Sequence, residues 1–193
     1  MEKRNQDAGI FVQKPVVVGK DLPFDPYIPS DCFFSEYDES ILLGIVNELT
    51  AIHERIESLG APSPKHLCDR TLFIFDDLVG SSLFSNRRKS AFKVLNTTHR
   101  HVSASMLEVS QAYRELPKTV RTNFTGLILF EIANAMELKA IYEENPCGMK
   151  RDVWEQAYAY CVDGEYAFMY INSKREKRLR IMRNFDEFVF VDK

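Results

Sequence analysis

Two adjacent carboxylates follow an unbroken apolar run in the middle of the chain. Asp76 and Asp77 come directly after residues 72–75, Leu-Phe-Ile-Phe. Such a run is typical of a strand buried on both faces of a parallel sheet, and open α/β sheets bind ligands at the carboxyl ends of their strands. One carboxylate there can hold Mg²⁺ while its neighbour orients and deprotonates an attacking water. An ordinary turn followed by a helix cap explains the same pair.

Three further side chains could complete a site for phosphoryl chemistry. Ser110-Gln111 ends the next predicted strand, and Gln111 could reach a γ-phosphate or an attacking water from there. Arg100 precedes that strand and Arg121 follows it. Their planar, always-charged guanidinium groups are suited to stabilising the oxygens of a transferring phosphoryl group. The alternative interpretation is a turn residue and two surface ion pairs.

Positive charge gathers in two stretches. Between Leu78 and Leu107 there is no acidic residue, and the basic ones are Arg87, Arg88, Lys89, Lys93 and Arg100. Near the C-terminus only Glu176 opposes a second group, Lys174, Arg175, Lys177, Arg178, Arg180 and Arg183. Either stretch could contact the phosphates of a nucleic acid, or form a solvated hairpin or helix face. The net charge of -3 is too small to indicate a polyanionic partner by itself.

Hydrophobic periodicity predicts the elements that must position these residues. Strands are expected at residues 16–18, 71–75, 102–109 and 126–130. Helices are expected at residues 39–59, 87–96, 134–144 and 150–161. A hairpin of residues 166–171 and 179–182 follows. The alternation predicts an α/β fold, a mainly parallel sheet with flanking helices and the C-terminal β-hairpin as an antiparallel edge.

Length and composition restrict the class of protein. With 193 residues, 45% of them apolar, the chain can form one sizeable core, and we expect a single domain at residues 16–193 after a poorly ordered segment at residues 1–15. The apolar runs are far shorter than the roughly 18 residues of a membrane span, so we expect no membrane partner. The four cysteines form no C-x-x-C pair, and the charged N-terminus is not a secretory signal. Both features favour an intracellular protein.

Three segments occur in one order at close spacing: TLFIFDDLVGSSL, LNTTHRHVSASMLEVSQAYRELPKTVRTN and TGLILFEI. Their combination of a strand with two Asp, an R-H dipeptide, a strand closing on S-Q and an L-P-x-x-x-R-x-N segment resembles one protein family. That family is the poxvirus-type DNA-packaging ATPases of the FtsK/HerA superfamily, found in large DNA viruses and in Maverick or Polinton elements. The resemblance covers residues 16–130.

The resemblance implies a P-loop NTPase-like (ASCE/RecA-like) fold that uses ATP and Mg²⁺. Asp76 and Asp77 would be the Walker B pair, with Asp76 on Mg²⁺ and Asp77 as the water-activating acid. Gln111 would be the polar sensor, and Arg100 or Arg121 would contact phosphate, across a subunit interface. The resemblance also implies double-stranded DNA as substrate, a homo-oligomeric ring, a capsid component as partner, and a location in a viral factory, a virion, or the host cytoplasm or nucleus.

The chain departs from this family at the phosphate-binding loop. The motif G-x-x-x-x-G-K-[ST] should precede Val16, yet the nearest string has Lys14 in place of the first Gly and Asp21 in place of the hydroxyl residue. Pro23 then blocks the helix whose N-terminus would hold the phosphates. We therefore expect the chain alone to bind ATP poorly, either as the C-terminal part of a longer motor or as a relic without hydrolysis.

Two other functions fit the same residues. A nonenzymatic α/β interaction module could bind nucleic acid or a protein through the basic hairpin, and Asp76 and Asp77 would then be turn and cap residues only. A metal-dependent nuclease would need a third carboxylate, and Asp69 is the only one close to the pair in sequence.

Overall fold

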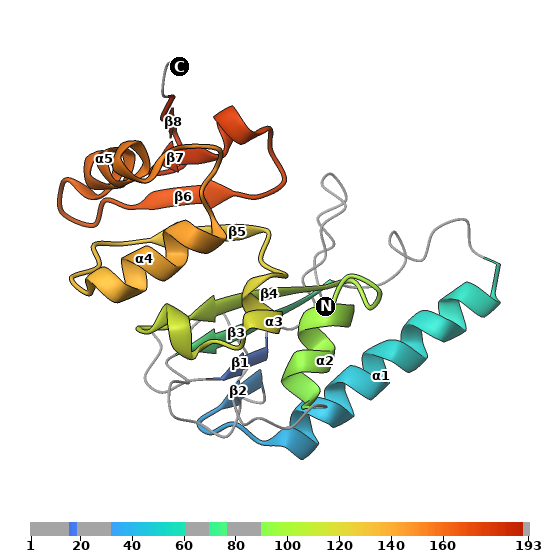
Figure 1. Ribbon diagram of the computed structural model, residues 1–193. Coiled ribbons are helices and arrows are strands. Elements are labelled where there is room, and N and C mark those ends of the chain that lie inside the picture. Colours follow the sequence, from blue (N-terminus) through green and yellow to red (C-terminus); the bar gives the residue numbers. More distant parts are fainter. Residues whose placement is uncertain (1–15, 19–31, 61–69, 77–89, 191–193) are drawn as a thin grey trace. The chain divides into compact units, whose positions relative to one another are not determined.

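A computed structural model of the chain describes residues 16–18, 32–60, 70–76 and 90–190. The chain divides into two compact units, Met1–Gln111 and Ala112–Lys193, here called unit 1 and unit 2 (Figure 1). Each unit contains one four-stranded sheet. The expectation of a single domain over residues 16–193 stays a prediction, and the segment at residues 1–15 lies outside the described residues.

The sheet of unit 1 is parallel throughout, with strand order β2-β1-β3-β4. Its strands are β1 (Val16–Val18), β2 (Phe33–Phe34), β3 (Thr71–Asp76) and β4 (Ala104–Val109). The apolar run of β3 forms an inner strand, as its pattern predicted, because an inner strand of a parallel sheet has no solvated face. Strand β4 begins two residues later than expected, and β2 was not predicted.

Two helices of unit 1, α1 (Glu39–Ser58) and α2 (Ala91–Thr98), pack together and against the parallel sheet (Figure 1). The ring of Phe92 on α2 packs edge-on against Phe75 of β3, with the centroids 5.0 Å apart. Glu39 Oε1 accepts a hydrogen bond from the Ala91 backbone N–H at 2.5 Å, which joins the first turns of the two helices. The predicted helix at residues 87–96 is therefore confirmed in its second half, while residues 87–89 lie outside the described part.

The sheet of unit 2 is antiparallel, with strand order β5-β6-β7-β8. Its strands are β5 (Gly126–Leu129), β6 (Met169–Asn172), β7 (Ile181–Arg183) and β8 (Glu187–Phe188). The predicted hairpin forms, but it pairs with β5 in this second sheet and not at the edge of the parallel one. The reason is one-sided burial: Leu129 is 5% exposed and Ile128 is 40% exposed, and this alternation suits an antiparallel strand with one open face.

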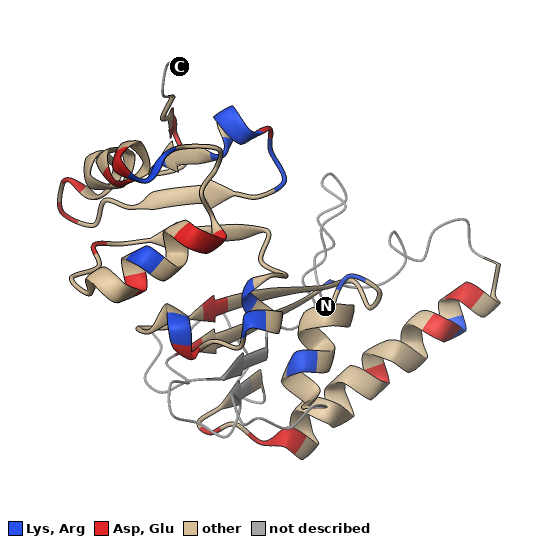
Figure 2. Cartoon of the chain, viewed as in Figure 1, with Lys and Arg blue, Asp and Glu red and all other residues tan. Residues whose placement is uncertain are grey.

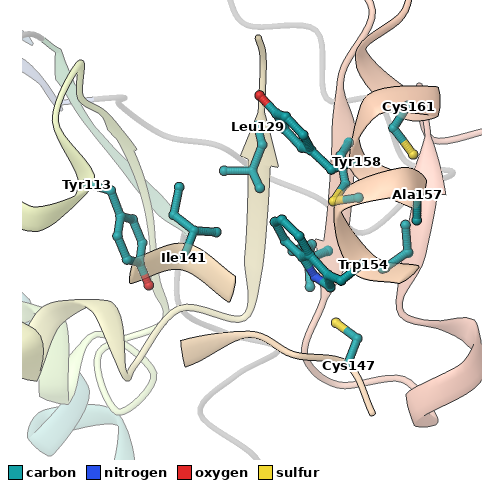
Figure 3. Close-up of a cluster of buried hydrophobic side chains, with 11 residues drawn as sticks. Tyr113, Leu129, Ile141, Cys147, Trp154, Ala157, Tyr158 and Cys161 are labelled. Carbon is teal, nitrogen blue, oxygen red and sulfur yellow. The ribbon is translucent and has the colours of Figure 1, made fainter. Parts of the chain in front are cut away.

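The helical elements of unit 2 are η4 (Tyr113–Glu115), α3 (Lys118–Arg121), α4 (Ala135–Glu144), α5 (Arg151–Val162) and η5 (Lys177–Leu179). Trp154 of α5 is fully buried and stacks on Tyr158, while Leu129 and Ile141 join the same cluster (Figure 3). This cluster covers one face of the antiparallel sheet. None of the helices described is long and apolar enough to span a bilayer.

Candidate functional site

The ends of β3 and β4 bring two of the predicted site residues to one edge of the parallel sheet. Asp76, the last residue of β3, pairs in register with Val109, the last residue of β4. Gln111 follows Val109 by two residues, so it lies at the same edge as Asp76. Asp77 lies outside the described residues. The ligand-binding edge of an open parallel sheet therefore carries a carboxylate and an amide from neighbouring strands.

The two faces of this edge differ in how they are covered. Phe75 points to the face on which Phe92 packs, so alternation along β3 directs Asp76 to the opposite face. On that opposite face Leu107 and Val109 of β4 are 44% and 49% exposed. Asp76 itself is partly buried. Ile74 of β3 lies on the same face and is 8% exposed, so this face is open over β4 and covered over β3. The carboxylate lies where the covered part meets the open part.

A buried polar pair, which the sequence analysis did not select, lies on the covered face. Glu108 of β4 accepts a hydrogen bond at 2.5 Å from the side-chain amide of Asn96 on α2, and Asn96 is 4% exposed. The other carboxylate oxygen of Glu108 is buried and has no hydrogen-bond partner in the described structure. Burial raises the pKa of Glu108 to about 7, although the Asn96 hydrogen bond opposes that shift. Glu108 is therefore partly protonated near neutral pH.

Arg100 lies at the opposite end of the parallel sheet from Asp76. It is exposed in the turn between α2 and β4, before the first residue of β4. Because β3 and β4 run parallel and each has six residues, the length of the strand separates the two residues, about 17 Å or more at a rise of about 3.3 Å per residue. Arg100 and Asp76 of one chain therefore do not share a site.

Arg121 is held by contacts within unit 2. Its guanidinium pairs with Glu144 at 3.0 Å and lies over the ring of Tyr113, 4.8 Å from the centroid. The Tyr113 hydroxyl donates to the other oxygen of Glu144 at 2.8 Å. Burial and the neighbouring Glu144 raise the pKa of Tyr113 to about 12, so the hydroxyl keeps its proton. The side chain of Arg121 is only 12% exposed. This network joins α3 and η4 to the end of α4.

The basic stretch near the C-terminus is well described, whereas Arg87, Arg88 and Lys89 lie outside the described residues. Figure 2 shows lysine and arginine gathered where the chain passes from β6 to β7. The exposed members are Lys174, Arg175, Lys177 and Arg178, here called the hairpin cations. The one acidic neighbour, Glu176, pairs with Arg178 at 3.6 Å, but both side chains are more than 70% exposed, so this pair neutralises little of the charge.

Oxygen donors suit Mg²⁺, and Asp76 presents a carboxylate at the sheet edge where such an ion would meet a phosphate. No three His, Cys, Asp or Glu side chains within the described ranges lie close enough together to form a protein-only metal cage. A site with one carboxylate is what Mg²⁺ uses when substrate phosphates and waters supply the other ligands. The donor set at this edge therefore fits nucleotide-bound Mg²⁺.

Residues 20–155 match the family of the poxvirus A32 protein. The chain belongs to this family. This membership confirms the resemblance to poxvirus-type DNA-packaging ATPases that the sequence motifs indicated. The matched span contains Asp76, Asp77, Gln111 and both candidate arginines. A search of curated protein sequences finds no match for the chain.

Solved structures share the fold at low sequence identity. The genome packaging NTPase B204 from Sulfolobus turreted icosahedral virus 2 in complex with AMP has a TM-score of 0.57 and 13% identity, over 91% of this chain and 82% of that one. The same NTPase with sulfate has a TM-score of 0.55 and 14% identity, over 88% and 80%. B204, the DNA-packaging ATPase from Sulfolobus Turreted Icosahedral Virus, has a TM-score of 0.50 and 14% identity, over 88% and 81%. These likenesses show that the chain shares the mixed α/β fold of those packaging NTPases.

Proposed function

We propose that this chain is part of an ATP-driven motor that moves double-stranded DNA in virus-like genome packaging. Membership of the poxvirus A32 protein family supports this role, and the placement of Asp76 and Gln111 at one edge of the parallel sheet is the observation that carries it. In this proposal Asp76 and Asp77 are the Walker B pair, and Gln111 is the sensor that reports the state of the γ-phosphate.

Asp76 would hold Mg²⁺ through a carboxylate oxygen, and the ion would supply charge neutralisation on the phosphates of ATP. Asp77 would orient and deprotonate the attacking water. The sequence contains no G-x-x-x-x-G-K-[ST] motif, so most backbone contacts to the phosphates must come from elsewhere. We therefore expect slow or undetectable hydrolysis by this sequence on its own.

Arg100 is the better candidate for an arginine finger, and it would act on the nucleotide of a neighbouring subunit. Its exposure leaves the guanidinium available, and its distance from Asp76 within one chain favours action between chains. A head-to-tail ring would bring the Arg100 end of one sheet to the Asp76 edge of the next. Arg121 would instead stabilise unit 2, because Glu144 already pairs with it.

The experiment measures Mg²⁺-dependent ATP hydrolysis by this chain, and by any natural product of the same reading frame that supplies G-x-x-x-x-G-K-[ST] upstream. Asp77→Asn should lower the turnover of the loop-bearing product by roughly 10²- to 10⁴-fold, as expected for loss of a general base. Asp186→Asn, an exposed carboxylate in the turn after β7, is the matched control and should hydrolyse normally. Normal hydrolysis by Asp77→Asn would refute the Walker B assignment.

An experiment that mixes two inactive variants tests whether Arg100 acts as an arginine finger between subunits. In the loop-bearing product, Arg100→Ala and Asp77→Asn subunits should each be nearly inactive alone, with Arg100→Ala losing roughly 10³- to 10⁵-fold. In random mixed rings about a quarter of the interfaces would join an intact Asp77 to an intact Arg100, and activity should recover accordingly. No recovery would mean that Arg100 does not act between subunits.

A second candidate function is a nonenzymatic module that binds nucleic acid or a protein through the basic hairpin. The exposure of the hairpin cations favours it. Salt-sensitive DNA binding that is unchanged by Asp77→Asn and by Mg-ATP would support this function over the motor. Binding that responds to Mg-ATP in the wild type, and no longer does so in Asp77→Asn, would support the motor.

A further inference from the structure

The antiparallel sheet of unit 2 has a second face, opposite the cluster around Trp154. Residues in direct register across its four strands form an apolar row on this face. Ile128 pairs with Tyr170, Tyr170 with Met182, and Met182 with Phe188. Their neighbours along the strands, such as Leu129 and Ile171, belong to the buried cluster. The row therefore lies on the side away from that cluster.

Aromatic rings extend this row into a connected group, here called the aromatic face. It comprises Phe130, Phe168, Tyr170 and Phe185, joined edge to face at centroid distances of 5.6, 4.8 and 4.8 Å. Phe130 and Phe185 at its borders are 55% and 51% exposed. Met182 in the middle of the row is buried at 7%, so the exposed apolar surface lies along the borders of this face. Exposed rings that gather on one face mark a candidate interaction site.

The backbone holds Phe185 on this face against its local preference. Phe185 has a φ of 70° and the preceding Asn184 has a φ of 51°. Asn adopts this left-handed region readily, whereas a bulky residue there is uncommon and strained. The turn between β7 and β8 therefore keeps a ring at a position where Asn or Gly would be the easier choice. Such strain is characteristic of functional positions.

The hairpin cations lie next to the aromatic face. The Arg175 guanidinium is stacked over Phe188, the last residue of the apolar row, 4.9 Å from the ring centroid. Arg180 Nε donates to the Arg175 carbonyl at 2.9 Å, which fixes the loop that carries these cations. A partner that fits both parts must combine negative charge with flat apolar surfaces. Unpaired nucleotides have both, since phosphates are anionic and every base has two π-faces.

We propose that the aromatic face and the hairpin cations together bind single-stranded nucleic acid. Exposed bases would stack on Phe130 and Phe185, while Arg175 and Lys177 would contact the phosphates. A duplex does not satisfy this surface, because its bases are already stacked on one another and only its phosphates are accessible to the cations. The inference rests on the second candidate function, nucleic-acid binding by the basic hairpin, and it adds that strands with unpaired bases are preferred.

The experiment is a fluorescence anisotropy titration of the full chain with a labelled oligothymidine of about 16 nucleotides and with a duplex of the same length. Phe185→Asn removes the ring and keeps a residue that tolerates the turn, and Phe130→Leu keeps apolar bulk. The double variant should bind the single strand roughly tenfold more weakly, as expected for loss of base stacking, and should bind the duplex within about twofold of wild type. Tyr160→Leu on α5 is the aromatic control.

A charge variant separates the two parts of the surface. The double variant Arg175→Gln with Lys177→Gln should bind both the single strand and the duplex more weakly. It should also show a smaller dependence of affinity on salt concentration. Lys139→Gln on α4 is the matched control. The emission of Trp154, the only tryptophan, shows in each variant whether the core of unit 2 is intact. If Phe185→Asn disturbs that emission, Phe130→Leu alone decides the test.

Three outcomes would overturn the proposal. If the aromatic variants bind the single strand as wild type while the charge variant does not, the face is not used, although the hairpin still binds nucleic acid. If wild type binds neither strand form, the nucleic-acid role of the hairpin fails as well. If the aromatic variants change the molar mass in light scattering and not the single-strand affinity, the face is an interface between copies of the chain.

Discussion

The two sheets place their polar and aromatic side chains by different means. In the parallel sheet of unit 1, strand register decides which side chains meet, so Asp76 and Gln111 come together at the strand ends. In the antiparallel sheet of unit 2, alternation along each strand decides, so one face is buried and the other carries rings such as Phe130. The edge of a parallel sheet offers a few polar groups at one point, which fits a small phosphorylated ligand. The face of an antiparallel sheet offers a row of side chains, which fits an extended polymer. In the two proposals above, the chain would therefore separate a hydrolysis site at the edge of one sheet from a polymer-binding surface on the face of the other.

The largest expected effects concern the cores that hold each arrangement in place. Phe92→Ala under the parallel sheet and Trp154→Ala under the antiparallel sheet each remove a fully buried ring. We expect each to lower the free energy of unfolding by about 3–5 kcal/mol, from lost burial and the cavity left behind. Urea unfolding followed by far-UV circular dichroism measures this. Tyr166→Ala, at an 81% exposed ring, is the control and should cost under about 0.5 kcal/mol.

Burial of Glu108 makes the stability of unit 1 depend on pH. Its pKa is about 7 when folded and 4.5 when free, so its contribution to stability is present below pH 4.5, falls between these values and is lost above about 7. Glu108→Gln should remove this dependence and gain up to about 3 kcal/mol relative to wild type between pH 4.5 and 8. Thermal unfolding across this pH range measures the gain. An equal gain for Glu165→Gln, an exposed carboxyl, would contradict the assignment to burial.

Arg121 tests whether the network of unit 2 is structural. Arg121→Met leaves Glu144 without its cation, and we expect a loss of about 2 kcal/mol in the free energy of unfolding. A double-mutant cycle with Glu144→Gln should be clearly non-additive. Lys139→Met breaks an exposed pair with Glu143 and should cost about 0.5 kcal/mol or less. Unchanged stability with loss of hydrolysis would instead make Arg121 a contact to phosphate.

The smallest effect concerns the start of α1, which packs with α2 in unit 1. Asp38 Oδ1 accepts hydrogen bonds from the backbone N–H groups of Ser40 and Ile41, at 2.7 and 3.2 Å. Asp38→Ala should therefore cost about 1 kcal/mol, whereas Asp38→Asn keeps the cap and should cost only a few tenths. Equal losses for the two variants in urea unfolding would show that the cap is not the cause.

Local patterns were sufficient to predict the elements that carry the candidate site. The run from Leu72 to Phe75 is wholly apolar, and a buried strand of a parallel sheet is the interpretation that its short length favours. Glu108 could not be found in the same way, because the alternate register of β4, with Leu107 and Val109, is at least as apolar as the one with Ala104 and Met106. Only the packing of α2 against the sheet shows which register faces inward.

Long-range pairing is what the sequence could not provide. Arg121 and Glu144 are 23 positions apart in the sequence, and no local sequence pattern indicates that their side chains form an ion pair. The pairing of β5 with β6 could not be predicted for the same reason. A short apolar strand such as β5 is compatible with a parallel or an antiparallel sheet until its partner is known. The position of Arg100 at the far end from Asp76 follows only from the parallel register of β3 and β4.

Among the described strands, β4 has a hydrogen-bonded neighbour on one side only. The backbone donors and acceptors along its other side are therefore a template for one more strand, and Leu107 and Val109 make the adjoining face of β4 apolar. An edge of this kind favours pairing with the same edge of a second copy. We expect self-association that rises with concentration and is suppressed by Leu107→Lys, as measured by static light scattering over a dilution series.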